Sequence, residues 1–294
     1  MRWFADAALL AVVLVWGVSF PLVQETVRAW PVSAFLALRF AIATLAFAPV
    51  LLTTRGRPWR SCLFPGFLAG LCLLLGFWLQ TEGLPSTTSA NAGFLTGISV
   101  VLVPLGARAC LGHRLRGAEV LGIGLVCLGL APLCLNEGFT LRAGDRLVLG
   151  CAFAFAAQIL IVGHYAPRLD PIRFTAVQVA TAALGTFAVA ALQPLPPALP
   201  AGVLGAAAFT GILATTMAFG VQTWAQGFTT PVHTALIFSL EPACAALMGW
   251  WWAGERLTFV QLGGAGLMLL GMLCGALGAL GGASKPATAP TSSP

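Results

Sequence analysis

One acidic and one basic side chain interrupt long apolar stretches of this sequence, and both can do chemistry that an apolar helix cannot. Glu241 lies near the middle of the apolar run 231–252, and Arg39 lies within the run 32–52. An ionised group in a nonpolar medium is costly, so such a residue is protonated, paired or in contact with a wet cavity. A carboxyl group in that position can accept a proton or bind an amine, whereas a guanidinium can bind a carboxylate.

Each of these two residues also has a structural interpretation. Pro242 cannot donate a backbone N–H, so a protonated Glu241 could instead satisfy a carbonyl group that the proline leaves unbonded. The Arg39 side chain could extend to the outer membrane interface, where its helix begins. The sequence leaves these alternatives open: Glu241 as a proton and substrate site or as a local hydrogen-bond partner, and Arg39 as a gate or counter-charge or as an interfacial residue.

Neutral polar and aromatic side chains within the apolar runs form a second group. In hydrocarbon each polar side chain must find a partner, so it faces another helix or a cavity. Asn91 and His233 are therefore gate residues, cavity residues or interhelical hydrogen-bond partners. Trp16 and Trp78 lie beside glycines and offer flat faces to a ligand, although packing alone also explains them. The residues expected to line a cavity are Trp16, Trp78, Gln80, Asn91, Phe94, Gln158 and Glu241, with Arg39 and His233 as gate or counter-charge residues.

The composition requires that a membrane surrounds these residues. Hydrophobic residues make up 59% of the chain and charged residues only 8%, whereas a soluble domain carries about a quarter charged residues. The arginines stand singly or in small groups in short loops, which argues against a nucleic-acid-binding face. No His, Cys or acidic cluster has metal-ligand spacing, and no hydrolase motif is present. We therefore expect a lipid-embedded chain without a metal, a cofactor or an enzymatic activity.

Ten apolar runs are long enough to cross a bilayer, because a spanning helix needs about 20 residues. They cover residues 5–24, 32–52, 62–82, 88–107, 117–135, 146–165, 172–192, 201–223, 231–252 and 259–280. The tail 284–294, SKPATAPTSSP, cannot bury apolar surface and is expected to be disordered.

The second half of the chain repeats the first at a shift of 142 positions. The matching pairs include Gly112/Gly254, Arg114/Arg256, Leu115/Leu257, Gly122/Gly264, Gly124/Gly266 and Gly129/Gly271. Five spans in each half is an odd number, so the halves must enter the membrane in opposite orientations. We predict an all-α integral membrane protein with ten transmembrane helices in two inverted five-helix repeats, residues 1–135 and 136–283, followed by a cytoplasmic tail at 284–294.

The distribution of positive charge predicts the orientation. Of the 15 Lys and Arg residues, ten fall in one set of alternate loops and four in the other. The positive-inside rule then places both termini in the cytoplasm, in an inner (cytoplasmic) membrane. Gly66/Gly70 and Gly271/Gly275 form GxxxG pairs that let helices approach closely, in a monomer or in a homodimer.

Short motifs occur in both halves in a characteristic order. The first half holds WGVSFP at 16–21, LRF at 38–40 and TTSANAGFLTGISVVLVP at 87–104, and the second holds TALI at 234–237, LEP at 240–242 and GERLT at 254–258. Together they resemble the EamA-type ten-helix carriers of the drug/metabolite transporter superfamily. One departure is GHRL at 112–115, where the family usually keeps a glutamate.

The resemblance implies a central cavity that opens to one side of the membrane at a time. It implies a secondary active transporter that moves a small organic metabolite, such as an amino acid, nucleoside or drug-like compound, by alternating access. We expect an exporter, with protons as the candidate coupling ion at Glu241. An uptake carrier or exchanger of the same fold, and a membrane subunit that transports nothing, remain the alternatives.

Overall fold

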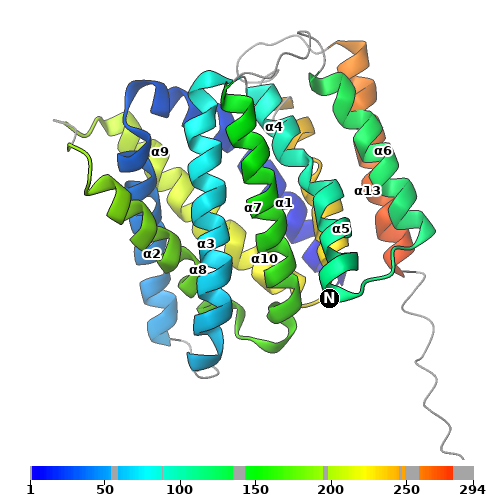
Figure 1. Cartoon of the computed structure of the whole chain (residues 1–294), viewed down its shortest axis with the longest axis horizontal. Coiled ribbons are helices and arrows are strands. Elements are labelled where there is room, and N and C mark those ends of the chain that lie inside the picture. Colours follow the sequence, from blue (N-terminus) through cyan, green and yellow to red (C-terminus); the bar gives the residue numbers. More distant parts are fainter. Residues whose placement is uncertain are drawn as a thin grey trace, which may run out of the picture.

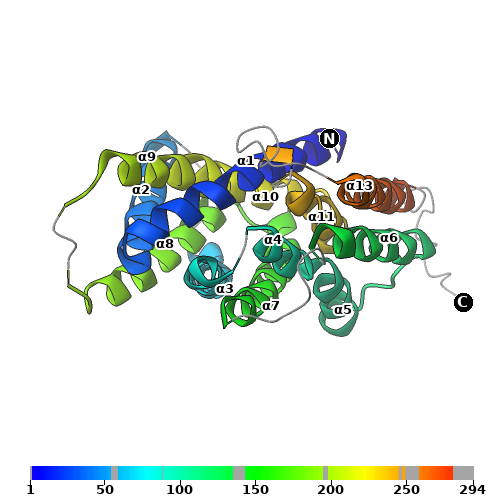
Figure 2. The same cartoon turned by 90° about the horizontal axis from the view of Figure 1, so that it is seen from above.

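The structure is a computed structural model that describes residues 2–53, 59–87, 89–134, 143–194, 198–244, 247–248 and 258–280. Every regular element in these ranges is helical. The helices form a bundle, which Figure 1 shows from the side and Figure 2 shows from above.

Seven of the described helical segments are long and apolar enough to cross a membrane, and two shorter apolar helices accompany them. The helices are α1 (Arg2–Ala29), α2 (Val32–Thr53), α3 (Arg60–Gly83), α4 (Ser89–Gly97), α5 (Ser99–Leu111), α6 (Gly117–Cys134), α7 (Ala143–Tyr165), α8 (Pro171–Ala190), α9 (Ala201–Gly211), η4 (Ile212–Met217), α10 (Ala218–Gln226), α11 (Pro231–Phe238) and α13 (Phe259–Leu280). Two short 3-10 turns, η1 (Leu84–Ser86) and η3 (Ala166–Arg168), follow α3 and α7. The predicted tail and part of the predicted span 231–252 lie outside the described residues.

Two of the predicted spans are interrupted where a single helix was expected. The run 88–107 divides into α4 and α5 at Ile98, whose N–H is shared between the carbonyls of Phe94 at 3.2 Å and Leu95 at 3.3 Å. In the second half, α11 ends before Ser239 and Leu240. Pro242 lies two residues after Leu240, and it cannot donate the N–H that would continue the α-helical ladder.

The two interruptions fall at equivalent places of the repeat, because the shift of 142 positions lays Ile98 on Leu240. Broken membrane helices are common in carriers, where the break lines a cavity that satisfies the freed backbone groups.

Helices α6 and α13 pack through glycines at two levels. A Cβ atom on Gly122 would lie 2.6 Å from the carbonyl oxygen of Gly271, and one on Gly129 would lie 2.5 Å from that of Gly264. Gly122, the earlier glycine of α6, contacts Gly271, the later glycine of α13. Gly129, the later one of α6, contacts Gly264, the earlier one of α13. The two helices are therefore antiparallel, and their backbones approach more closely than any side chain would allow.

The first and last described helices share one edge of the bundle. In Figure 1, α1 begins and α13 ends at the lower edge of the molecule. Helix α1 runs upward from that edge, whereas α7 runs downward from the upper edge.

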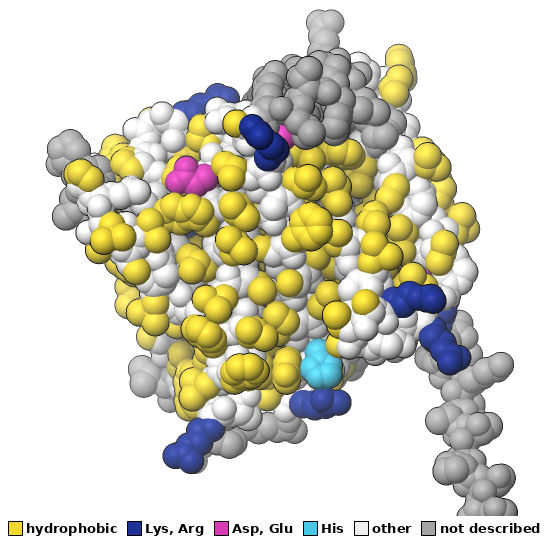
Figure 3. Space-filling model, viewed as in Figure 1, with side chains coloured by type: hydrophobic (Ala, Val, Ile, Leu, Met, Phe, Trp, Pro, Cys, Tyr) yellow, Lys and Arg dark blue, Asp and Glu magenta, His cyan; other side chains and the backbone are white. Residues whose placement is uncertain are grey.

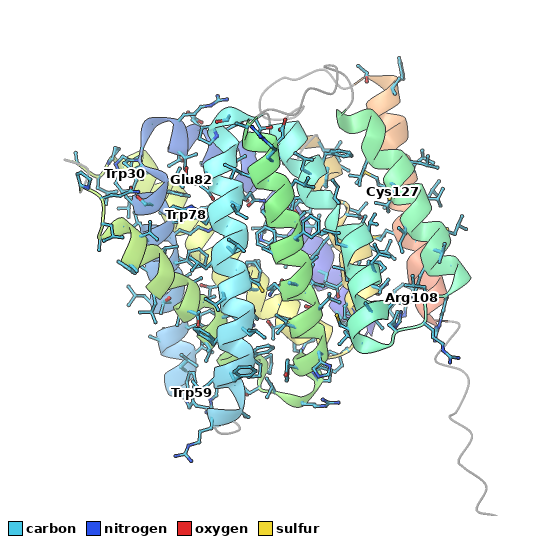
Figure 4. All side chains as sticks on the ribbon, viewed as in Figure 1. Trp30, Trp59, Trp78, Glu82, Arg108 and Cys127 are labelled. Atoms are coloured by element: carbon cyan, nitrogen blue, oxygen red, sulfur yellow. The ribbon has the colours of Figure 1, made fainter. Side chains whose placement is uncertain are left out.

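The surface is suited to lipid. On the face seen in Figure 3, hydrophobic side chains cover the middle and the charged side chains gather near the upper and lower edges. Leu45, Phe64 and Leu184 are each more than 65% exposed. Trp30 and Trp59 lie near opposite edges in Figure 4, at depths where interfacial tryptophans are usual. The described chain is that of a multi-pass membrane protein.

Candidate functional site

A cavity lies inside the bundle, and both halves of the chain contribute to its wall. Its volume, measured to the centre of a water molecule, is about 60 Å³, which is room for a few waters. Its aromatic side chains are Trp16, Phe20, Phe77, Phe155, Phe219 and Phe238. Its neutral polar side chains are Ser19, Gln80, Thr96, Ser99, Gln158 and Gln222. Its charged side chains are Arg39 and Glu241.

Arg39 projects from α2 into this cavity and is only 3% exposed. Its Nε donates a hydrogen bond to Thr215 Oγ1 at 2.9 Å, and its guanidinium carbon lies 4.3 Å from the centroid of the Phe77 ring. The interpretation of Arg39 as an interfacial residue is therefore wrong, because the side chain is enclosed by the protein rather than extended to the membrane surface.

A π-helical turn, η4, positions the partner of Arg39. The Thr215 hydroxyl donates to the carbonyl of Thr210, five residues earlier, at 2.8 Å, and so it is free to accept the bond from Arg39. Such turns widen a helix locally and are frequent at functional sites. Gly211 precedes the turn, and a Cβ atom there would lie only 2.8 Å from the Arg39 carbonyl oxygen. The close contact of α2 with α9 thus depends on this glycine.

Glu241 lies just beyond the interruption that follows α11, and it is partly exposed to the cavity. Within the described residues it accepts no hydrogen bond and forms no ion pair, with Arg39 or with any other residue. The alternative in which Glu241 serves only as a local hydrogen-bond partner receives no support from these contacts. The cavity instead holds one basic and one acidic side chain that form no direct ion pair.

Four glutamines connect the cavity wall to neighbouring helices. Gln222 on α10 donates to Gln158 on α7 at 2.9 Å, and Gln158 donates to Gln178 on α8 at 3.0 Å. Gln222 also donates to Gln226 at 3.0 Å. Each of these side chains thereby forms at least one hydrogen bond inside the bundle, although Gln178 Nε2 and Gln222 Oε1 are buried without a partner among the described residues. The chain of amides holds α7, α8 and α10 together beside the cavity.

The structure brings together five of the nine residues that the sequence analysis selected. Trp16, Gln80, Gln158, Glu241 and Arg39 all line the cavity. The indole of Trp16 donates to the carbonyl of Ala214 in η4 at 2.9 Å, so this residue also ties α1 to the distorted helix.

The other four residues lie elsewhere or are not described. Trp78 and Phe94 are partly buried in the hydrophobic core and do not contribute to the cavity wall. His233 is 4% exposed at the start of α11, where its Nε2 lies 2.9 Å from Asp6 Oδ1 of α1. The backbone of Asn91 belongs to α4, but its side chain is outside the described part of the chain.

The five phenylalanines of the wall were missed, because a phenylalanine on an apolar helix gives no sign of which face it takes. The repeat carries a signal for part of this wall. The shift of 142 positions lays Phe77 on Phe219, Gln80 on Gln222, Trp16 on Gln158, Thr96 on Phe238 and Ser99 on Glu241. All ten of these residues line the cavity. Ten of the eighteen wall residues are thus equivalent positions in the two halves.

Comparison with known proteins agrees with this architecture. The sequence profile of the EamA-like transporter family matches residues 3–134 and again residues 142–275. A protein of Archaeoglobus fulgidus named an uncharacterized transporter is 32% identical over 277 residues, which are 92% of this chain and 85% of that protein. A protein of Streptantibioticus cattleyicolor named a probable terminal-alkyne amino-acid exporter is 25% identical, over 90% of this chain and 92% of its own length.

Solved structures share the fold. One crystal structure superposes with a TM-score of 0.75 at 20% sequence identity, and the match covers 95% of this chain and 99% of the other. The Archaeoglobus fulgidus relative carries the word transporter in its name, and the family profile covers both halves of the sequence. The chain therefore belongs to the EamA-like transporter family, within the drug/metabolite transporter superfamily, and is a membrane transporter.

Proposed function

We propose that this protein exports a small organic metabolite by alternating access, with the cavity as its substrate site. The observation that carries the proposal is that five pairs of equivalent residues from the two halves form the wall of one cavity. Sites at the interface of two repeats can be opened to either side when the halves rearrange. The two interrupted helices, at Ile98 and Leu240, border this site and supply the positions where such a rearrangement can bend the bundle.

The proposal includes ten transmembrane helices in two inverted repeats, residues 1–135 and 136–283. The antiparallel contact of α6 with α13 supports it, because these helices are equivalent in the repeat and meet through exchanged pairs of glycines. The opposite directions of α1 and α7 support it in the same way. The two family matches, which begin at residues 3 and 142, agree with these boundaries.

The orientation is proposed with both termini in the cytoplasm and the chain in the cytoplasmic membrane. The start of α1 and the end of α13 at one edge of the bundle support a common side for the two termini. The excess of arginines in one set of loops favours the cytoplasm for that side.

Glu241 is the proposed coupling site. A carboxyl group without an ion-pair partner in a cavity is stable when it holds either a proton or a cationic substrate group. Competition of the two for one carboxylate would couple export of substrate to entry of protons. The name of the Streptantibioticus cattleyicolor relative supports export as the direction.

Transport by the purified protein in proteoliposomes tests the proposal. We expect a metabolite library to contain compounds whose flux accelerates when a pH gradient is imposed. Glu241→Gln should abolish the acceleration, while Glu82→Gln, which changes a carboxyl group of α3 outside the cavity wall, should keep it. Vesicles of known orientation separate export from uptake and from exchange. A folded protein that moves none of the compounds in any orientation would favour a non-transporting subunit instead.

A further inference from the structure

We propose that the substrate is a zwitterion, whose carboxylate binds Arg39 and whose ammonium group binds Glu241. This inference rests on the proposed transport function and names the chemical class of the substrate. It follows from how the structure holds the two charged groups of the cavity wall.

Arg39 is fixed in position but its binding groups are unused. Thr215 occupies Nε, and Phe77 covers one face of the guanidinium. The two terminal nitrogens have no hydrogen-bond partner among the described residues, although the side chain is almost fully enclosed. These nitrogens are not among the fully buried atoms that lack a partner, so they reach the cavity, where water or a ligand can satisfy them. Two parallel N–H donors of this kind match the two oxygens of a carboxylate, which would satisfy both.

Thr215 and Phe77 make this arrangement a receptor rather than a flexible charge. The bond from Nε sets the rotation of the guanidinium plane, and the aromatic face prevents the plane from tilting toward α3. A group held in this way loses little side-chain entropy when a ligand binds. Thr215 acts as a positioning residue, because it touches Arg39 and does not itself need to touch the substrate.

Glu241 supplies the opposite charge in the same cavity. It accepts no hydrogen bond from the described residues and forms no ion pair with Arg39. The two residues are the charged members of the described wall, so the wall carries one positive and one negative group when Glu241 is ionised. A ligand with one charge would leave one of these groups unpaired, whereas a zwitterion pairs both.

The rest of the wall indicates an apolar substituent on that zwitterion. Six aromatic side chains face the cavity, and they favour a hydrocarbon or aromatic group over a polar one. Apolar α-amino acids have this combination of groups, and they are the probes that we would use. Because the cavity holds only a few waters in this structure, binding one of them requires the wall to widen as the two halves rearrange.

The test compares each of L-leucine, L-methionine and L-phenylalanine with two derivatives, the amide, which lacks the carboxylate, and the deaminated acid, which lacks the ammonium group. Binding to the detergent-purified protein is measured by titration calorimetry at a pH where the amine is charged. We expect at least one amino acid to bind tenfold or more tightly than both of its derivatives, because each derivative loses one charge-assisted contact.

Two variants make the assignment specific to each residue. Arg39→Gln should bind the amino acid no better than the amide binds to the wild type, and Glu241→Gln should bind it no better than the deaminated acid does. General damage to the fold would weaken the binding of every ligand by a similar factor. It would not make each variant lose its preference for one particular charged group of the ligand. If either variant fails to fold, the comparison of each amino acid with its two derivatives on the wild-type protein still tests the proposal.

The inference is overturned if the amides bind as tightly as the amino acids, or if none of the amino acids binds. Flux of a singly charged or neutral compound through the same proteoliposomes would then leave the transport function standing and remove only the zwitterion. Absence of flux for the whole metabolite library would count against the transport function itself.

Discussion

Replacing Gly211 with alanine should separate α2 from α9 and disturb the site of Arg39. A Cβ atom at position 211 would lie 2.8 Å from the Arg39 carbonyl oxygen and 3.1 Å from Ile42 Cγ2, whereas ordinary contact begins at about 3.4 Å. The nearest neighbour is backbone, which cannot rotate out of the way. Helix α2 must therefore move by roughly half an ångström, and Arg39 moves with it.

The size of the effect follows from two opposing contributions. Forcing an extra carbon into a packed contact costs about 1–3 kcal/mol. Alanine is more stable than glycine within a helix by about 0.5–1 kcal/mol. Gly205 lies on the same helix with no atom within 4 Å of its Cβ position, so Gly205→Ala receives the second contribution without the first. The two variants should thus differ by about 1–3 kcal/mol in the free energy of unfolding.

Denaturant unfolding of both variants in one detergent measures this difference, and thermal unfolding checks its sign. Gly211→Ala should be the less stable of the two and should also transport more slowly, since the bond between Arg39 and Thr215 depends on the spacing of α2 and η4. Equal stability of the two alanine variants, together with equal flux, would refute the claim that this glycine sets the spacing.

Three further substitutions follow from the same reasoning. Trp16→Phe removes the bond to the Ala214 carbonyl and should cost about 1 kcal/mol in thermal or denaturant unfolding, with a weaker apparent substrate affinity in flux assays. Gln158→Leu interrupts the chain of amides and should lower the free energy of unfolding by about 1–3 kcal/mol; a stability equal to the wild type would mean that water replaces the lost partner. Gly271→Ala should destabilise the protein relative to Gly266→Ala on the same helix, because only the first places a Cβ against a carbonyl of α6, at 2.6 Å; a lower unfolding midpoint for Gly266→Ala would contradict this packing.

The sequence predicted the class of the fold from the lengths of its apolar runs. It also predicted the most informative site residues, because a charge or an amide inside such a run must face something other than lipid. Glu241, Arg39 and Gln158 were found in this way, and all three line the cavity.

The aromatic wall and the local helix distortions could not be read from hydropathy. Phe77 and Trp78 are neighbours of similar character, yet only Phe77 faces the cavity, because consecutive residues on a helix point in different directions. The π-helical turn at η4 depends on long-range contacts, with Arg39 on one side and Trp16 on the other. The local sequence of residues 212–217 does not predict this turn.

The two halves of the cavity wall share some residues but differ in charge, and this difference bears on how the protein can select a substrate. Phe77 and Phe219 are identical partners in the repeat, as are Gln80 and Gln222. Glu241, in contrast, is equivalent to Ser99 in the repeat. Arg39 is equivalent to Thr181, which packs against Gly70 and does not line the cavity. A frame with equivalent halves can open to either side at similar cost, because the same contacts are exchanged in the two states. A wall with a single positive and a single negative group binds a ligand in one orientation. If the proposals above hold, the duplicated positions serve the movement, and positions at which the halves differ, Arg39 and Glu241 among them, serve the recognition.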